Sequence, residues 1–172
     1  MIQFQATLKA ISHSTILQLP EAASRKLPSR GQVFVKGTLN GYAIQEVIEP
    51  DGNMGHWLKL NKQLLDMLKL SVGDNVTLEV EPSKDWPEPT IPADFSKALK
   101  TAPSSVQELW PAITPMARWE WIRWVSSTHV VDTRKRRVEV SISKMESGKR
   151  RPCCFNLSSC TDPDLAKSGK LI

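Results

Sequence analysis

The sequence is poor in the features that would assign it to a secreted or membrane class. Its three cysteines, Cys153, Cys154 and Cys160, all lie within the last twenty residues, so they form no disulfide framework for a core and are expected to be reduced. No stretch reaches the roughly 18 to 20 apolar residues that a membrane helix needs. The N-terminus also lacks the basic-then-apolar layout of a signal peptide. We therefore expect a cytoplasmic protein without a membrane span.

Motifs that would name a reaction are absent as well. The sequence has no HExxH, no GxSxG, no GxxxxGK[ST] and no Rossmann glycine fingerprint. The histidines, His13, His56 and His129, are far apart and lack ligand spacing, and the cysteines contain no CxxC pair. We therefore predict no catalytic residue, no metal site and no cofactor, and expect the histidines to be surface or packing residues.

Positive charge is concentrated in residues 132–151, which we call the basic segment. It holds eight basic and three acidic residues and accounts for the whole net charge of +5. Arg134, Lys135 and Arg137 lie at the start of a predicted helix. The helix dipole already places a partial positive charge at that end, so the clustering of these residues there costs stability. Such a cluster favours an anion-binding site. The predicted anion-binding residues are Arg118, Arg134, Lys135, Arg137, Lys149, Arg150 and Arg151.

An alternative interpretation of the basic segment is structural. Arg134 and Arg137 would then pair with Asp132, Glu139 or carboxylates of the preceding domain. Arg150 and Arg151 also lie close enough to the cysteines to favour a thiolate, although an ordinary thiol in a mobile tail is the simpler expectation.

The first 80 residues alternate with the period of two that is typical of half-buried strands, with turn signals such as Asn40-Gly41 between them. Residues 17–35 and 58–80 repeat one order of strand, helical turn, glycine turn and strand. Two such units can close around a pseudo-twofold axis as one small barrel with helices as lids. We therefore predict a barrel domain at residues 1–85.

The composition then changes to prolines and afterwards to helical spacing. Residues 86–92 are expected to be a proline-rich linker, residues 93–151 a helical module and residues 152–172 a flexible tail that contains the cysteines. Pro103 should end the first helix, and Thr114 should cap a helix that starts at Pro115. Asp132 or Thr133 is the expected cap of the last helix, and Gly148 its C-terminal stop.

Four of the six tryptophans crowd into residues 110–124, and the angles between them on a helix prevent all from facing one core. Packing in the core or between domains is the ordinary interpretation. The alternative is that Trp121 and Trp124 form an aromatic contact with bases beside the basic segment.

Several stretches resemble a known family. The helical module of the YdeI/OmpD-associated, or bacteriocin-protection, family is similar to four stretches of the second half, which are IPADFSKALK, PSSVQELW, TPMARWEWIRWV and DTRKRRVEVSISKMESGK. The domain of unknown function 1905, which is often fused ahead of that module, is similar to four stretches of the first half, which are FQATLKA, LPEAASRKL, VKGTLNGY and WLKLNKQLLDMLKLSVGDNVTLEV. The resemblance covers about residues 2 to 151 and implies an α+β protein whose N-terminal domain is a double-split β-barrel similar to AbrB and MazE. Positions that match the helical module are Pro92, Asp94, Leu99, Arg118, Trp124, Thr133, Arg134, Arg137 and Gly148.

These observations favour a non-enzymatic cytoplasmic binding or interaction protein. The basic segment would bind an anionic partner, either nucleic acid or an acidic protein surface, and the resemblance implies a role in stress or bacteriocin protection. A nucleic-acid-binding protein is the first alternative. An enzyme with a cryptic site around His56, Asp74 or the cysteines is the second. We expect the two repeats to complete the barrel within one chain, which favours a monomer.

Overall fold

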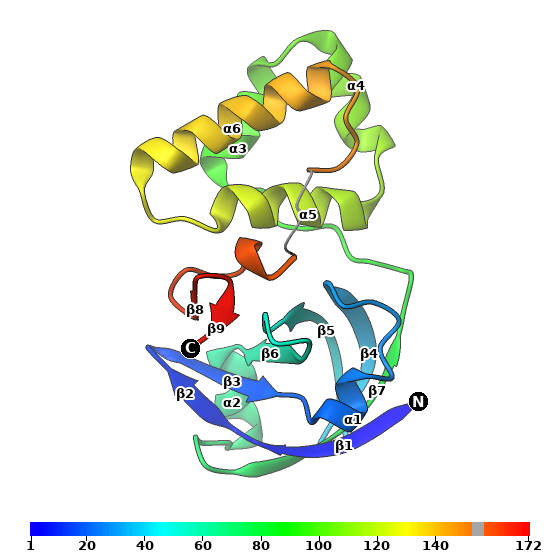
Figure 1. Ribbon diagram of the computed structural model, residues 1–172. Helices are drawn as coiled ribbons and strands as arrows, with labels where there is room; N and C mark the ends of the chain where they lie inside the picture. The colour runs from blue at the N-terminus through cyan, green and yellow to red at the C-terminus, as the bar shows by residue number, and fades with distance from the viewer. Residues whose placement is uncertain (153–156) are drawn as a thin grey trace. The chain divides into compact units, whose positions relative to one another are not determined.

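The computed structural model of the chain describes residues 1–152 and 157–172 (Figure 1). Two compact units are distinguished. The barrel unit comprises residues 1–85 with 157–159 and 164–172, and the helical unit comprises residues 86–152 with 160–163. The α+β class is confirmed, since one unit is a curled antiparallel sheet and the other a helical module. The likeness of the sheet to the AbrB and MazE barrels stays a prediction.

The sheet of the barrel unit curls so that its two edges meet in the first stretch of chain. Its order is β1-β7-β4-β5-β6-β3-β2, and β1 and β2 are separated in the sequence by Leu8 alone. One continuous N-terminal segment therefore pairs with β7 at one end of the sheet and with β3 at the other. The strands are β1 (Ile2–Thr7), β2 (Lys9–Ile11), β3 (Ser14–Gln18), β4 (Val33–Leu39), β5 (Tyr42–Pro50), β6 (His56–Leu60) and β7 (Asn75–Pro82).

The internal repeat is present in the structure. β3, α1 (Glu21–Ser24) and β4 have the same order as β6, α2 (Lys62–Leu68) and β7. Corresponding strands pair with each other, because β3 is antiparallel to β6 with Leu17 opposite Leu58, and β4 is antiparallel to β7. The apolar residues of the alternating pattern fill the interior, where Leu17, Val35, Leu58 and Leu78 are buried.

The hairpin between β4 and β5 forms where Asn40-Gly41 predicts it. Asn40 and Gly41 have φ of 47° and 82°, the positive values that a type I′ turn requires at both positions. The turn places Leu39 opposite Tyr42, so it sets the register of the longest strand, β5.

The end of the chain differs from the expected flexible tail. After the 3-10 helix Leu157–Cys160, a short hairpin of β8 (Ala166–Lys167) and β9 (Lys170–Leu171) lies on the barrel unit. Leu165 is fully buried and packs with Ile16 and Trp57, and the Leu171 amide donates to the Asp51 carbonyl at 2.9 Å. Gly52 has a φ of +80°, and a Cβ there would lie 2.1 Å from the Gly169 carbonyl oxygen. An apolar anchor thus orders residues 164–172, which polar composition alone did not indicate.

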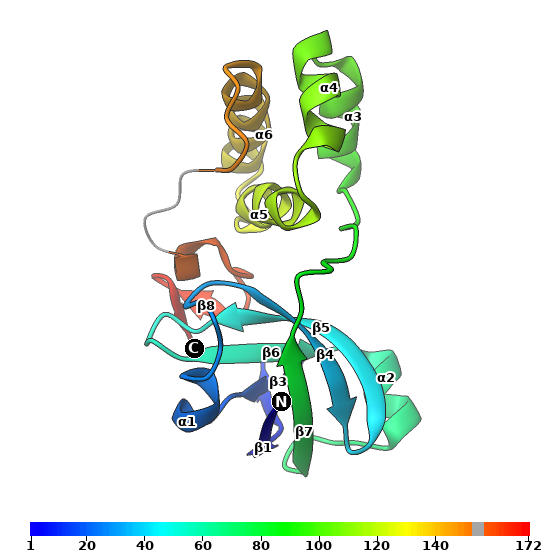
Figure 2. The same ribbon diagram turned by 90° about the vertical axis from the view of Figure 1, so that its right-hand side faces the viewer.

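The helical unit contains α3 (Ala93–Thr101), α4 (Ser104–Ala112), α5 (Pro115–Ser126) and α6 (Val131–Glu146). Figure 2 shows α3 and α4 side by side, α6 facing them and α5 crossing next to α6. The core is formed by Phe95, Leu99, Val106, Trp121, Val125, Val138 and Met145. As expected, α3 ends before Pro103 and the Thr114 hydroxyl caps α5 by accepting from the Ala117 amide at 3.2 Å.

In the described residues, no helix combines the length and the apolar composition that crossing a membrane requires.

Candidate functional site

Arg134, the first arginine of the basic segment, is held by a residue of a different helix. Its Nε lies 2.7 Å from Asp94 Oδ2 and its Nη2 lies 3.0 Å from Asp94 Oδ1, so α6 and α3 are joined by a two-pronged ion pair. The hydrogen bonds from Arg134 lower the pKa of Asp94 below its ordinary value. The pairing resembles the structural alternative, but the partner is neither Asp132 nor Glu139.

Arg137 binds to the end of α5. Its Nη1 donates to the Trp124 carbonyl at 2.9 Å and to Ser127 Oγ at 2.5 Å, and its guanidinium lies 5.6 Å from the centroid of the Trp124 ring. Lys144 Nζ lies 5.2 Å from the same centroid. The half-buried Trp124 ring is therefore already in contact with two cations of its own chain.

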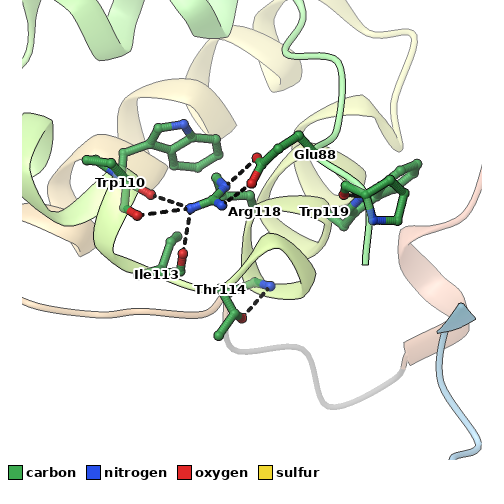
Figure 3. A network of polar contacts seen from close by, with 9 residues as sticks. Glu88, Trp110, Ile113, Thr114, Arg118 and Trp119 are labelled. Atoms are coloured by element: carbon green, nitrogen blue, oxygen red, sulfur yellow. Dashed lines mark hydrogen bonds and ion pairs between the residues drawn. The ribbon is translucent and has the colours of Figure 1, made fainter. Parts of the chain in front are cut away.

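Arg118 is the centre of a buried network that ties the proline-rich segment to the helices (Figure 3). Its Nε and Nη2 contact the Glu88 carboxylate at 2.9 and 2.5 Å, and its Nη1 donates to the carbonyls of Trp110 and Ile113 at 3.0 and 2.5 Å. Arg118 is 8% exposed. Its position is structural, and the prediction that it binds an external anion disagrees with its burial.

The same network shows that residues 86–92 belong to the helical unit. Trp119 Nε1 donates to the Pro87 carbonyl at 2.7 Å, and the rings of Trp86 and Trp119 meet edge to face. The segment expected to be a linker therefore packs on α5, because Arg118 donates to the Glu88 carboxylate and Trp119 to the Pro87 carbonyl.

Trp121 and the last arginines are also used internally. Trp121 is fully buried, and its Nε1 donates to the Arg150 carbonyl at 3.0 Å. The Arg150 side chain donates to the Ala112 carbonyl, while Arg151 forms an ion pair with Glu120. A base cannot stack on Trp121 while the helical unit is folded, so the predicted aromatic contact is wrong for this residue.

The remaining basic side chains of the segment are unengaged. Within residues 1–152 and 157–172, Lys135, Arg136 and Lys149 have no side-chain hydrogen bond or ion pair. Lys135 lies near the start of α6, whereas Lys149 follows its end, so on a helix that rises about 1.5 Å per residue they are roughly 20 Å apart. Lys135 and Lys149 therefore cannot contact one small anion together.

Lys135 lines a cleft of about 530 Å³ between α3 and α6. Ala98, Val131 and Val138 contribute apolar surface to it, and Val131 is 78% exposed. Lys97 of α3 and Lys135 of α6 line it from opposing helices. The full lining is Asp94, Lys97, Ala98, Thr101, Thr128, His129, Val131, Arg134, Lys135, Val138 and Glu139. The volume falls within the roughly 300 to 1,000 Å³ of known ligand sites.

The start of α6, which borders this cleft, lacks a side-chain cap. The N-cap is Val130, with no side-chain hydrogen bond, so the prediction that Asp132 or Thr133 caps the helix is wrong. The helix begins two or three residues earlier than expected, because the Thr128 hydroxyl accepts a hydrogen bond from the Val130 amide at 3.2 Å and turns the chain there. The early start brings the exposed Val131 to the cleft.

Sequence reasoning missed most of the cleft. Of its lining, Arg134 and Lys135 were predicted, whereas Lys97, Thr101 and Val138 were not assigned to a site. A usable signal exists in the spacing of α3, because Asp94, Lys97 and Thr101 are three and four residues apart and share one helix face.

His56 and Asp74, named above for a cryptic enzyme site, form hydrogen bonds within the barrel unit. His56 is fully buried, its Nδ1 lies 2.7 Å from Ser24 Oγ and its Nε2 lies 3.1 Å from the Gly31 carbonyl oxygen. Burial, its largest influence, lowers the pKa of His56. The Asp74 carboxylate accepts from the Ser71 amide in a turn. Cys160 is buried, and Cys153 and Cys154 lie outside the described residues.

Family models match both units. Residues 4–80 match the domain of unknown function DUF1905, and residues 88–148 match the family described as bacteriocin-protection, YdeI or OmpD-associated. No curated protein matches the chain. The two matches agree with the stretches that carried the resemblance in the sequence. The chain therefore joins a segment that matches DUF1905 to a segment that matches the bacteriocin-protection, YdeI or OmpD-associated family.

Proposed function

We propose that this chain is a cytoplasmic, non-enzymatic binding protein whose α3–α6 cleft takes an acidic, partly apolar segment of a partner protein. The observation that carries the proposal is the cleft itself, whose lining combines apolar side chains with one lysine from each of two helices. The family description names bacteriocin protection, and capture of a protein partner is a way for a chain without a catalytic motif to take part in such a role.

The charge of the cleft supports an acidic partner. Residues 86–155 hold twelve basic and seven acidic residues, so this part of the sequence carries the whole net charge of +5. In the lining, Arg134 and Asp94 neutralise each other. Lys97 and Lys135 then outnumber the one remaining acidic residue, Glu139. Such a rim attracts a negatively charged partner and increases its rate of association.

The apolar part of the lining favours a protein over a nucleic acid. Nucleic-acid sites combine continuous basic tracks with exposed aromatic rings. Here Trp121 is buried, and Trp124 is in contact with Arg137 and Lys144. Some basic residues of α6 are bound within the protein, and others are exposed to solvent. The exposed Val131, with the half-buried Ala98 beside it in the lining, instead offers contact area that suits leucine or valine side chains of a peptide.

The test is fluorescence anisotropy with three labelled probes. One peptide contains glutamate and leucine, a second replaces every glutamate by glutamine, and the third probe is duplex DNA. We expect saturable binding of the acidic peptide that weakens as salt increases, and at least tenfold weaker binding of the glutamine peptide. Equal binding of both peptides would contradict an acidic partner. Tighter binding of DNA than of either peptide would favour the nucleic-acid-binding alternative.

A further inference from the structure

An unpaired carboxylate lies on the inward face of the barrel sheet. Glu46 is the middle residue of β5 and shares a face with Ile44 and Ile48, which are 6% and 0% exposed. Its partner across the ladder, Val35 on β4, is fully buried. Within the described part of the chain, the Glu46 carboxylate has no hydrogen bond and no ion pair. An ionised carboxylate among buried apolar side chains lowers the stability of the fold unless a cation or a hydrogen-bond donor pairs with it.

Glu46 lines a pocket of about 210 Å³ between β5 and α2. This volume is below the roughly 300 Å³ at which drug-sized ligand sites begin, so it suits one extended side chain. The lining is Tyr42, Ala43, Ile44, Gln45, Glu46, Asn61, Gln63, Leu64 and Met67. Among these residues Glu46 alone carries a formal charge. The charged residues of the adjoining elements, Lys36, Lys59, Lys62 and Asp66, are outside the lining.

The walls of the pocket suit an apolar stem. Met67 is 53% exposed and Tyr42 is 42% exposed, so two large apolar side chains of the rim are open to solvent. An aliphatic chain can pack against Leu64 and Met67, while Tyr42 offers a ring face to a cation. Burial raises the pKa of Glu46 above its ordinary value of 4.5. An incoming cation would offset that burial, because an opposite charge within a few ångströms favours the ionised carboxylate.

We propose that the β5–α2 pocket binds a basic side chain, lysine or arginine, of a partner protein, with Glu46 as its counter-ion. The stem of the lysine or arginine lies along Leu64 and Met67, and the amides of Gln45 and Gln63 are placed at the rim for the partner's main chain. The site is independent of the α3–α6 cleft, since all of its residues belong to the barrel unit.

Two probes that differ in one charged group test the pocket. Nα-acetyl-lysine amide and Nα-acetyl-norleucine amide have similar stems, but the norleucine probe lacks the ammonium group. We expect the lysine probe to produce saturable NMR shifts in β5 and α2 and to bind at least tenfold more tightly than the norleucine probe. Equal binding of the two probes, or no lysine-specific shift at the highest soluble concentration, would overturn the proposal.

Glu46→Gln is the matching variant, and Glu81→Gln, an exposed carboxylate of β7, is its control. The first should abolish the preference for lysine over norleucine, and the second should leave it unchanged. Loss of the preference in both variants would show that the general charge of the barrel unit, and not Glu46, attracts the probe.

The stability of Glu46→Gln checks that the carboxylate is unpaired. Because burial raises its pKa in the folded state, the folded protein binds this proton more tightly than the unfolded chain does. The corresponding stability is present below pH 4.5 and is lost as the pH rises through the folded-state pKa. At pH 7 Glu46→Gln should therefore have a higher unfolding midpoint than the wild type, with a smaller difference below pH 4.5. A lower midpoint at pH 7 would mean that Glu46 has an internal partner, which would overturn the pocket's role.

Discussion

Replacement of Arg118 by methionine is expected to unfold the helical unit at denaturant concentrations that leave the barrel unit folded. Methionine fills a similar volume but cannot donate, so the carbonyls of Trp110 and Ile113 lose their donor. Glu88, whose side chain is 65% exposed, is left without its partner. A buried carbonyl that loses its donor costs about 1 to 3 kcal/mol, and the loss at two carbonyls is a large part of a small domain's stability.

Tryptophan fluorescence measures this effect selectively. Five of the six tryptophans lie in residues 86–124, and Trp57 is the sixth. We expect the fluorescence transition of Arg118→Met to move to lower denaturant, while NMR signals of the barrel strands persist. Glu88→Gln is the control, because it removes the charge but leaves the carbonyl contacts, and it should cost about 1 kcal/mol or less. An Arg118→Met transition that coincides with that of the wild type would show that the network contributes little to stability.

Reversal of the two cleft lysines is expected to abolish binding of the acidic peptide. In Lys97→Glu/Lys135→Glu, both helices present negative charge to the partner, and each reversed contact costs roughly 1 to 1.5 kcal/mol at low salt. The Kd should therefore increase by about 30- to 140-fold, since 1.4 kcal/mol corresponds to a factor of ten. Both side chains are exposed, so the fold should tolerate the change.

Lys100→Glu/Lys149→Glu provides the matched control. These lysines belong to the same unit, are exposed, and lie outside the cleft lining. The control changes the net charge by the same amount, so it should reproduce the weakening that long-range attraction causes, which is about three- to fivefold at low salt and less at moderate salt. Equal loss of affinity in the two double variants would show that net charge, rather than the cleft, determines binding.

The barrel could be predicted because its signals are local. The period of two identifies the face of β4, β6 and β7 that points into the core, although Phe34 and Trp57 on the opposite faces are buried as well. Asn40-Gly41 specifies its turn through backbone conformations that few residue pairs adopt. The repeat then predicts which strands pair, and β3 with β6 and β4 with β7 fulfil it. Thr114 likewise caps α5 through a bond to a residue three positions away.

The role of the basic segment could not be predicted in the same way because its partners are distant in sequence. Arg134 is forty positions from Asp94, and Arg151 is thirty-one positions from Glu120. Carbonyl groups that bind Arg118, Arg137 and Arg150 leave no trace in composition at all. A count of charges therefore overstates the cations available to a ligand. The candidate site moves from seven basic residues of the sequence to Lys135, with Lys97 added from another helix.

The C-terminal residues illustrate a second limit of composition. A polar stretch with glycine and serine indicated a flexible tail, yet Leu165 is fully buried beside Trp57. One apolar side chain placed over an apolar patch is sufficient to order a short hairpin when its backbone also bonds to a neighbouring loop, as the Leu171 amide does to Asp51. A single leucine forms no repeating apolar pattern, so its burial could not be predicted from the sequence.

Methyl NMR of the wild-type protein during titration with the acidic peptide tests the central claim most directly, because it locates the binding site. Binding in the α3–α6 cleft predicts saturable shifts of the Ala98, Val131 and Val138 methyl groups, while the methyl groups of Val76 and Val80 in the barrel core remain unchanged. Shifts confined to residues outside the cleft, with Val131 and Val138 unaffected at saturation, would contradict the claim.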